Sequence, residues 1–301
     1  MAYLETTIIS VVLMILLGYI LKRIDLFKID DVDTLNKIVI NVAMPSMIFI
    51  TIYKANFSIF PQLVTMPFVG LIIGACSGIF MYLLFTFKEY PKRKKWALIL
   101  PVSLGNTAFL GFPLTLGVFG NEGLIRAIFY DMSSLIMFLS LSAILIFIFG
   151  GEIKNSLKSL FKFPVLWAVL LGVLFNFFNV SIGEIADIAI NYLAAATVPL
   201  IMISIGLSLQ FKGIEKGIKS TSLVTFFKLI ISPILAFFIL GFLGFSGLEH
   251  SVGFFESAMP CSMLTLTLAI ENNLDFKLTA NCIVITTVIS LITVPILMGV
   301  L

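Results

Sequence analysis

Charged side chains are scarce in this sequence. Only 12% of its 301 residues are Asp, Glu, Lys or Arg, whereas a soluble domain has about a quarter. Too few polar residues remain to cover a soluble fold of this length, and no polar stretch is long enough to form a large extramembrane domain. A soluble enzyme, a disordered chain and a disulfide scaffold are therefore excluded.

Residues that carry metal or nucleophilic chemistry are scarce as well. The sequence has one histidine, His250, and three cysteines, Cys76, Cys261 and Cys282, which lie in apolar segments. Their spacing fits neither a metal site nor a disulfide framework, and it offers no nucleophile–base pair. No dense basic patch with interleaved aromatics indicates nucleic acid. The sequence thus predicts a protein that is not an enzyme, binds no metal or cofactor and has no nucleic-acid partner.

Apolar residues, in contrast, are abundant. They make up 60% of the chain, about 180 residues, and one membrane-spanning helix takes about 20. The apolar runs are long and continuous, without the alternation typical of barrel strands, so we expect helices. The sequence predicts an all-α polytopic membrane protein with ten transmembrane helices, near residues 3–21, 33–53, 64–87, 96–118, 122–149, 163–180, 185–210, 219–243, 250–271 and 276–300.

Basic residues then predict the orientation of these helices. Most of the 19 Lys and Arg residues fall in the odd-numbered connections, which by the positive-inside rule are cytoplasmic. We therefore expect a plasma-membrane protein with both termini outside the cytoplasm. The first apolar run has its basic residues after it rather than before it, so we read it as a retained helix. The basic residues of the odd connections are Lys22, Arg23, Lys28, Lys88, Lys92, Arg93, Lys94, Lys95, Lys154, Lys158, Lys162, Lys212, Lys216, Lys219 and Lys277.

The two halves of the chain resemble each other at an offset of about 154 residues. Five predicted helices in each half is an odd number, so the halves must be inverted relative to each other, as in many secondary transporters. We expect repeats at residues 1–149 and 163–301, joined by a cytoplasmic linker at 150–162. The matching positions are Leu16–Gly18 with Leu170–Gly172, Asn36 with Asn191, Pro45 with Pro199, and Ser133–Ser134 with Thr286–Thr287.

Two of the predicted helices are interrupted by polar residues and proline near mid-span. Counted from Trp96 and His250, Asn106 and Pro260 both lie about 15 Å deep, half of a ~30 Å hydrocarbon core. An offset of about 152 aligns Ala108 with Pro260, so the two breaks correspond. A plain proline kink is the simpler reading, and it is the one we favour for Pro45 and Pro199.

A break of this kind frees backbone groups that must find partners in a medium without water, and freed helix N-termini suit an anion. Asn106 can orient a polar group without adding net charge. The expected crossover hinges are Gly111, Pro113 and Pro260. The candidate substrate-binding residues are Asn106, Thr107, Gly105, Pro260, Ser262, Met259, Asn41 and Ser46.

Three charges, Asp131, Lys228 and Glu256, fall inside predicted spans, where each costs at least ~2.5 kcal/mol and therefore usually faces a cavity or a partner. Glu256 lies one turn before Pro260 and is the first candidate for proton coupling, because removal from water favours the protonated carboxyl. Lys228 could pair with Asp131 or with Glu256. Equally, Lys228 could snorkel to the surface and Asp131 could act only as a cap. Arg126 we expect at the membrane interface.

The segments LNKIVINVAMPSMIF (35–49) and SLGNTAFLGFPL (103–114) resemble the auxin efflux carrier family, which includes the plant auxin carriers and many prokaryotic permeases. The resemblance implies a secondary carrier of organic anions with broken helices four and nine. Helices 1, 2, 6 and 7 would form a scaffold domain at a homodimer interface, and helices 3–5 and 8–10 a transport domain that moves like an elevator. The family's crossover asparagine in helix four corresponds to Asn106, and its crossover proline in helix nine corresponds to Pro260. Two departures weaken any transfer of auxin specificity. The loop after helix five is short, whereas the plant carriers have a long one, and Ala258–Ser262 lacks the asparagine that some relatives have in helix nine.

The leading hypothesis is therefore a transporter of small organic carboxylates, of which malate and malonate are the type associated with prokaryotic relatives, coupled to protons or driven by the membrane potential. A sodium-coupled symporter of the bile-acid-transporter type is the alternative, with Lys228 in the place of a cation. A receptor that binds the same ligand without transport is a third reading.

Overall fold

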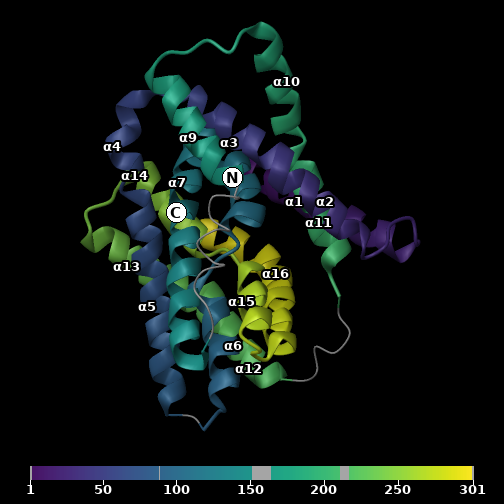
Figure 1. The fold of residues 1–301 in the computed structure, drawn as a ribbon, viewed down its shortest axis with the longest axis vertical. Helices are drawn as coiled ribbons and strands as arrows, with labels where there is room; N and C mark the ends of the chain where they lie inside the picture. Colours follow the sequence, from purple (N-terminus) through teal and green to yellow (C-terminus); the bar gives the residue numbers. More distant parts are fainter. Residues whose placement is uncertain (1, 88, 151–163, 211–216, 300–301) are drawn as a thin grey trace.

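The computed structural model describes residues 2–87, 89–150, 164–210 and 217–299, and the regular secondary structure of this part of the chain is all helix apart from one isolated antiparallel bridge. The predicted linker at 150–162 lies almost wholly outside the described residues. Figure 1 shows the helices in order: α1 (Ala2–Arg23), α2 (Asp31–Ile38), η1 (Val39–Ala43), α3 (Met44–Tyr53), η2 (Phe57–Ile59), α4 (Phe60–Leu63), α5 (Met66–Thr86), α6 (Lys92–Ser103), η3 (Thr107–Gly111), α7 (Phe112–Phe149), α9 (Pro164–Phe177), α10 (Glu184–Ala195), α11 (Thr197–Ser208), α12 (Ile218–Phe226), η4 (Phe227–Ile231), α13 (Ser232–Phe242), α14 (Gly247–Ser257), α15 (Leu264–Glu271) and α16 (Phe276–Met298).

Seven helical stretches among the described residues are long and apolar enough to cross a membrane, and α9 is a shorter apolar helix. This confirms the prediction of an all-helical polytopic membrane protein. Seven is fewer than ten for three reasons. Helix α9 is too short to count, the stretch expected at 250–271 is interrupted, and the stretch expected at 96–118 is interrupted with its second half continuing into the next helix. The resulting helical stretch, Thr107–Phe149, has 43 residues, and non-helical backbone at Gly120, with φ 66°, marks a kink inside it.

One group of helices packs through small residues. Helix α1 packs on α11, and α3 packs on α9. A Cβ added to Gly18 would collide with the carbonyl oxygen of Ile203, and one added to Gly172 would lie 3.2 Å from the carbonyl oxygen of Phe49. Glycine therefore lets each helix pair approach backbone to backbone, as is common in membranes. Both pairs of residues are related by the offset of 154, so the two halves repeat this contact.

The other helices form a second group. Helix α5 packs against α6 and α7, α14 packs against α7 and α13, and α16 packs against α6 and α12. In Figure 1, α5, α6, α12 and α16 extend through the lower part of the molecule, α13 and α14 lie on the left, and α1, α2 and α11 lie together on the right. Buried Ser and Thr side chains stabilise the packing by returning hydrogen bonds to backbone carbonyls, as Thr279 does to Ala97 at 3.1 Å.

The predicted proline kinks fall where the backbone changes its helical form. Pro45 follows the π-helical turn η1 and begins α3, and Pro199 lies in the first turn of α11, just after the junction with α10. Both stretches remain helical across these points, which is consistent with kinks rather than breaks.

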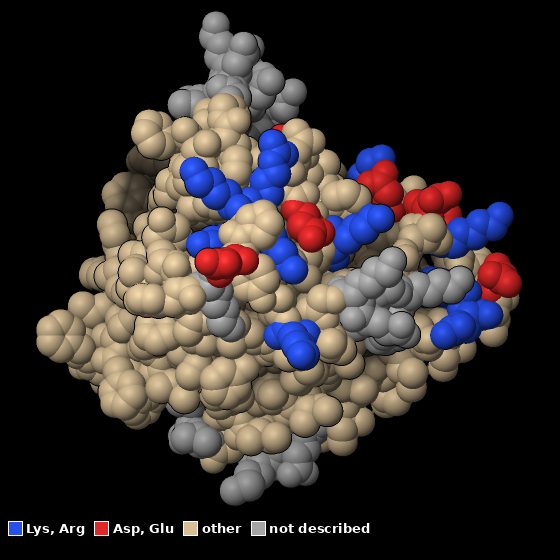
Figure 2. Space-filling view, turned by 90° about the horizontal axis from the view of Figure 1, so that it is seen from below, with Lys and Arg blue, Asp and Glu red and all other residues tan. Residues whose placement is uncertain are grey.

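Basic side chains gather at one end of the molecule, seen from below in Figure 2 together with several acidic ones. We call this end the basic face. Lys22 lies at the end of α1 and donates to the carbonyls of Leu207 and Leu209, where a cation is favoured by the helix C-terminus. Lys88, Lys154, Lys158, Lys162, Lys212 and Lys216 lie outside the described residues. The described basic residues of the odd connections are Lys22, Arg23, Lys28, Lys92, Arg93, Lys94, Lys95, Lys219 and Lys277.

Candidate functional site

Two short extended segments, Leu104–Asn106 and Pro260–Ser262, pair with each other in antiparallel fashion. Helix α6 ends just before the first segment and α14 ends shortly before the second. The backbone N–H of Asn106 donates to the carbonyl oxygen of Pro260 at 2.7 Å, and the N–H of Ser262 donates to Leu104 at 3.0 Å. Between them lies the bridge of Gly105 with Cys261. Each segment thus satisfies part of the other's backbone, which membrane burial requires. We call the paired segments the crossover.

Asn106 lies opposite Pro260 across the crossover, 154 residues away in the chain. The correspondence of Ala108 with Pro260 as repeat positions, at an offset of about 152, stays a prediction.

Each segment of the crossover is anchored to a long helix of its own half of the chain. The hydroxyl of Thr107 donates to the carboxylate of Asp131 and lies 3.3 Å from that of Ser134, both on α7. In the other half, the N–H of Cys261 donates to the hydroxyl of Thr286 on α16 at 3.1 Å. Asp131 therefore positions the crossover, as well as lying in the span.

The carboxamide of Asn106 faces a cavity of ≈ 70 Å³, which we call the crossover cavity. Asn106 makes no side-chain hydrogen bond with the described residues, so the amide is available to a ligand. Across the cavity, Ser204 donates to the Oδ1 of Asn36 at 2.5 Å. The cavity is lined by Asn36, Asn106, Phe109, Ser204, Ile205, Ser208, Leu209, Met263, Ile283, Val284 and Thr287.

Behind the crossover lies a second cavity of ≈ 20 Å³, which we call the buried-charge cavity and which has room for one or two water molecules. It brings Lys228 and Glu256 together with Gly105, Thr107 and Ser103. Lys228 lies in η4 with 5% of its surface exposed, so it does not snorkel to the surface. It forms no ion pair with any described residue.

The ammonium group of Lys228 lies close to the crossover backbone. A Cβ added to Gly105 would be 3.2 Å from its Nζ. Glycine at this position therefore leaves room for the charge beside the broken helix. In surroundings of low dielectric constant, such a charge acts strongly on neighbouring polar groups.

Glu256 is fully buried in α14. Its Oε1 accepts a hydrogen bond from the hydroxyl of Thr115 at 2.6 Å, and its Oε2 has no partner among the described residues. A Cβ added to Gly111 would collide with this carboxyl group, so glycine is what admits it. One oxygen of Glu256 is thus held in place and the other is free to take a proton.

The other sequence candidates lie elsewhere. Asn41 and Ser46 donate at 2.8 Å to carbonyls of their own helix and line none of the three cavities described here. Met259 is fully buried beside the crossover. Pro113 lies in continuous helix after the break, as Gly111 does, so their role as hinges stays a prediction.

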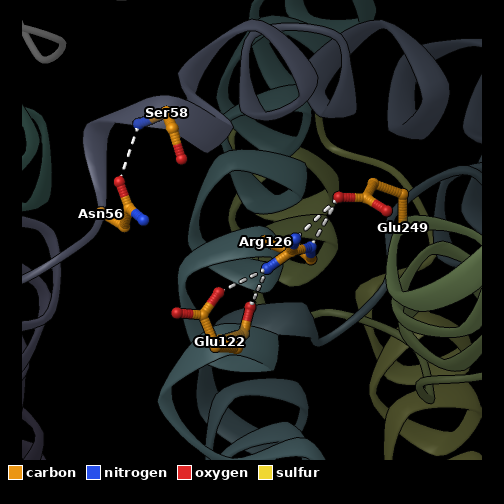
Figure 3. Close-up of polar contacts among 5 residues, drawn as sticks. All are labelled: Asn56, Ser58, Glu122, Arg126 and Glu249. Carbon is orange, nitrogen blue, oxygen red and sulfur yellow. Dashed lines mark hydrogen bonds and ion pairs between the residues drawn. The ribbon is translucent and has the colours of Figure 1, made fainter.

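The surroundings of Arg126 were not predicted. Its place at the membrane interface stays a prediction, but the side chain is buried between α7 and α14 (Figure 3). Its guanidinium donates twice to Glu249 on α14, from Nε and Nη2 at 2.8 Å, and it contacts Glu122 at 3.0 Å. Figure 3 also shows Asn56 accepting from the backbone of Ser58 at the end of α3. No local pattern predicts the Arg126 cluster, because Glu249 is 123 residues away in the chain.

A third cavity, of ≈ 300 Å³, was not foreseen either. It lies between α3, α10 and α7 and includes Lys54, so we call it the Lys54 cavity. The Nζ of Lys54 pairs with Asp187 at 2.7 Å. The cavity is lined by Met47, Ile50, Thr51, Lys54, Ala55, Leu116, Asn121, Glu122, Leu124, Ile125, Asn191, Ala194 and Ala195.

Apolar spanning helices, charges buried between them and broken helical segments at a cavity define a polytopic membrane protein of the transporter class. The chain belongs to the membrane transport protein family, also called the auxin efflux carrier family, whose model matches residues 3–298. This confirms the resemblance seen in the sequence.

The chain is similar to several curated transporters. An uncharacterized transporter of Methanothermobacter thermautotrophicus is 44% identical over 96% of this chain and 95% of its own length. One of Methanocaldococcus jannaschii is 39% identical over 95% of both chains. The uncharacterized transporter YfdV of Escherichia coli is 26% identical over 81% of this chain and 80% of its own. Family and relatives point to a transporter rather than an enzyme.

Proposed function

We propose that this protein is a secondary active transporter of small organic carboxylates, with its substrate site at the crossover. The observation that carries the proposal is that Asn106, whose side chain makes no hydrogen bond with the described residues, lines a cavity while Lys228 and Glu256 lie buried beside the same broken helices. In this proposal the basic face is cytoplasmic, both termini are outside and the protein is in the cell membrane.

An anion suits this site better than a cation. The amide of Asn106 donates hydrogen bonds, and the ammonium of Lys228 lies beside Gly105 without an ion-pair partner among the described residues. The positive charge is not neutralised by direct contact, so it raises the electrostatic potential at the crossover. A carboxylate bound at Asn106 is stabilised both by hydrogen bonds from the amide and by the positive potential of Lys228.

Proton coupling follows from the two charges. With Glu256 ionised, its charge and that of Lys228 cancel within the buried-charge cavity. When the free Oε2 of Glu256 takes a proton, the cavity keeps a net positive charge, and carboxylate binding at the crossover strengthens. Proton and anion would then bind and leave together. Asp131, which accepts from Thr107, is the second group that could respond to a proton.

Movement of one group of helices against the other would open the site to each side of the membrane in turn. The crossover cavity lies between Asn36 and Ser204 of α2 and α11 on one wall and Asn106 and Thr287 on the other. In this proposal helices 1, 2, 6 and 7 form the scaffold and the homodimer contact, and the remaining helices move as an elevator. The repeated contacts of Gly18 and Gly172 support two inverted five-helix repeats.

Uptake of labelled malonate into liposomes containing the purified protein tests the proposal. Uptake driven by an inward proton gradient, and unaffected by sodium, supports it. Uptake that requires sodium alone would favour the sodium-coupled alternative. Binding of malonate without any uptake or exchange would favour a receptor.

A further inference from the structure

We propose that the Lys54 cavity is a second carboxylate-binding site, on the side of the membrane opposite the basic face, with Lys54 as its anion-binding residue. This inference rests on the proposed function, because it concerns the path of the same substrate. Lys54 follows directly after α3, whereas the helical stretch 31–53 begins beside the basic connection, about 35 Å away along the helix. The site would take up the anion before it reaches the crossover.

The Lys54 cavity is the repeat counterpart of the crossover cavity. Its scaffold wall and that of the crossover cavity correspond residue by residue at offsets of 154 or 155. The crossover cavity is lined by Asn36, Ser204, Ile205, Ser208 and Leu209, and the counterparts Asn191, Ile50, Thr51, Lys54 and Ala55 all line the Lys54 cavity. Such agreement is expected if both cavities belong to one pathway through an inverted repeat.

The opposite walls of the two cavities do not correspond. The crossover cavity is closed by residues 283–287 of α16, whose counterparts on α7 at an offset of 153 are residues 130–134. The Lys54 cavity is instead lined by residues 121–125 of α7. The difference is about nine residues, or about 13 Å of helix. In this conformation Asn106 of the crossover lines the crossover cavity, whereas the residues that line the Lys54 cavity include none of the crossover, so the Lys54 cavity is a separate chamber.

Charge is the main chemical difference between the two scaffold walls. Lys54 lies at the position that Ser208 has in the crossover cavity, and no other Lys or Arg of the described residues lines the Lys54 cavity. The Nζ of Lys54 pairs with Asp187 at 2.7 Å, with about half of the lysine side chain exposed. Exposed ion pairs of this kind are weak, so a carboxylate in the cavity can compete for the ammonium.

The other polar groups of the cavity suit the same ligand. The side-chain N–H of Asn191 donates a hydrogen bond to the carboxylate of Asp187 at 3.1 Å, which holds this amide beside Lys54. Asn121 adds a second amide. The acidic lining residue, Glu122, is already paired with Arg126 at 3.0 Å, so its charge is partly neutralised. A volume of ≈ 300 Å³ is at the lower limit of ligand pockets and admits a small dicarboxylate with water.

The test measures the charge preference of the cavity directly. Cys76, which is exposed, is replaced by Ser, and Thr51→Cys places a thiol in the cavity, while Cys261 and Cys282 stay buried. Membrane-impermeant methanethiosulfonates, one anionic and one cationic, are added from the side opposite the basic face. The two labelling rates are compared with Lys54 present, with Lys54→Gln, and with malonate added.

We expect Lys54→Gln to lower the anion-to-cation ratio of labelling rates about fivefold or more, and Asp187→Asn to raise it. Malonate should slow labelling only when Lys54 is present. The matched control is Ile205→Cys, the counterpart of Thr51, labelled from the basic face in inverted vesicles, where Lys54→Gln should change nothing. Asp187→Asn keeps the lysine, so it tests the proposal even if Lys54→Gln fails to fold.

An anion-to-cation ratio that neither substitution changes, or equal protection by malonate with and without Lys54, would overturn the inference. The proposed function is tested separately. If labelling is charge-selective and slowed by malonate, but the protein does not transport malonate, the proposed transport is rejected and the Lys54 site is retained. Malonate transport with an unselective cavity would do the reverse.

Discussion

The backbone N–H of Asn106 donates to the carbonyl oxygen of Pro260 at 2.7 Å, joining two residues that lie 154 positions apart in the chain. Two interrupted helices thereby satisfy part of each other's backbone, as burial in a membrane requires. The same contact places Asn106 at the edge of the crossover cavity, which it lines.

Asn106→Ala should weaken binding of malonate about 10-fold or more. The variant loses a hydrogen bond to a charged ligand, worth about 1.5–3 kcal/mol, but no bond to the described part of the protein. Thermal shift of the purified protein against malonate measures the change. Asn41→Ala is the matched control, because that amide bonds only to its own helix. Equal malonate-dependent stabilisation in wild type and the Asn106 variant would refute the site.

Glu256→Gln should abolish the stimulation of malonate uptake by a proton gradient and leave malonate exchange intact. Glutamine has nearly the same shape and can still accept from Thr115, but it cannot take up a proton at the position of Oε2. Uptake and exchange are measured at two external pH values. Glu271→Gln, which changes an exposed carboxyl at the end of α15, serves as the control. Persistent proton-driven uptake in the Glu256 variant would show that Asp131 or another group carries the proton.

Gly111→Ala should destabilise the protein by about 1–3 kcal/mol, because the new methyl group overlaps the buried carboxyl of Glu256. We expect a lower thermal unfolding temperature in detergent. Gly241→Ala is the control, since nothing lies within 4 Å of a Cβ at that position. Combining Gly111→Ala with Glu256→Ala should restore much of the loss, which a simple helix effect at Gly111 would not allow.

Arg126→Met should destabilise the protein by about 2–3 kcal/mol. This is less than the ~3–5 kcal/mol of a fully buried pair, because Glu249 keeps 16% of its side chain exposed. Adding Glu249→Gln should recover part of the loss, and the double-mutant cycle gives the coupling. Lys37→Met breaks an exposed pair with Asp33 and should change the unfolding temperature little. Additive effects of the Arg126 and Glu249 substitutions would contradict the buried pairing.

Much of the architecture could be predicted because apolar run length and lysine placement are local signals. The helix breaks at Asn106 and Pro260 were foreseen from polar residues and proline in apolar segments. The direct pairing of the two segments across the crossover was not predicted, because no local pattern shows which backbone groups of distant segments meet. Lys228 and Glu256 were recognised as intramembrane charges, but their cavity depends on glycines at 105 and 111, whose role emerges only from packing.

The sites that sequence reasoning missed depend on long-range contacts. Arg126 meets Glu249, and Lys54 meets Asp187, across more than 120 residues of chain. Each of these residues lies near a predicted span end, where a charge is unremarkable. Tertiary structure, rather than any local pattern, turns them into a buried cluster and a cavity.

The measurement that tests the central claim most directly is counterflow of labelled malonate in liposomes preloaded with unlabelled malonate. The account predicts a transient overshoot for wild type and for Asn41→Ala, and none for Asn106→Ala when that variant is folded and inserted. An overshoot of wild-type size with Asn106→Ala, or none in wild type that binds malonate, would contradict transport through the crossover.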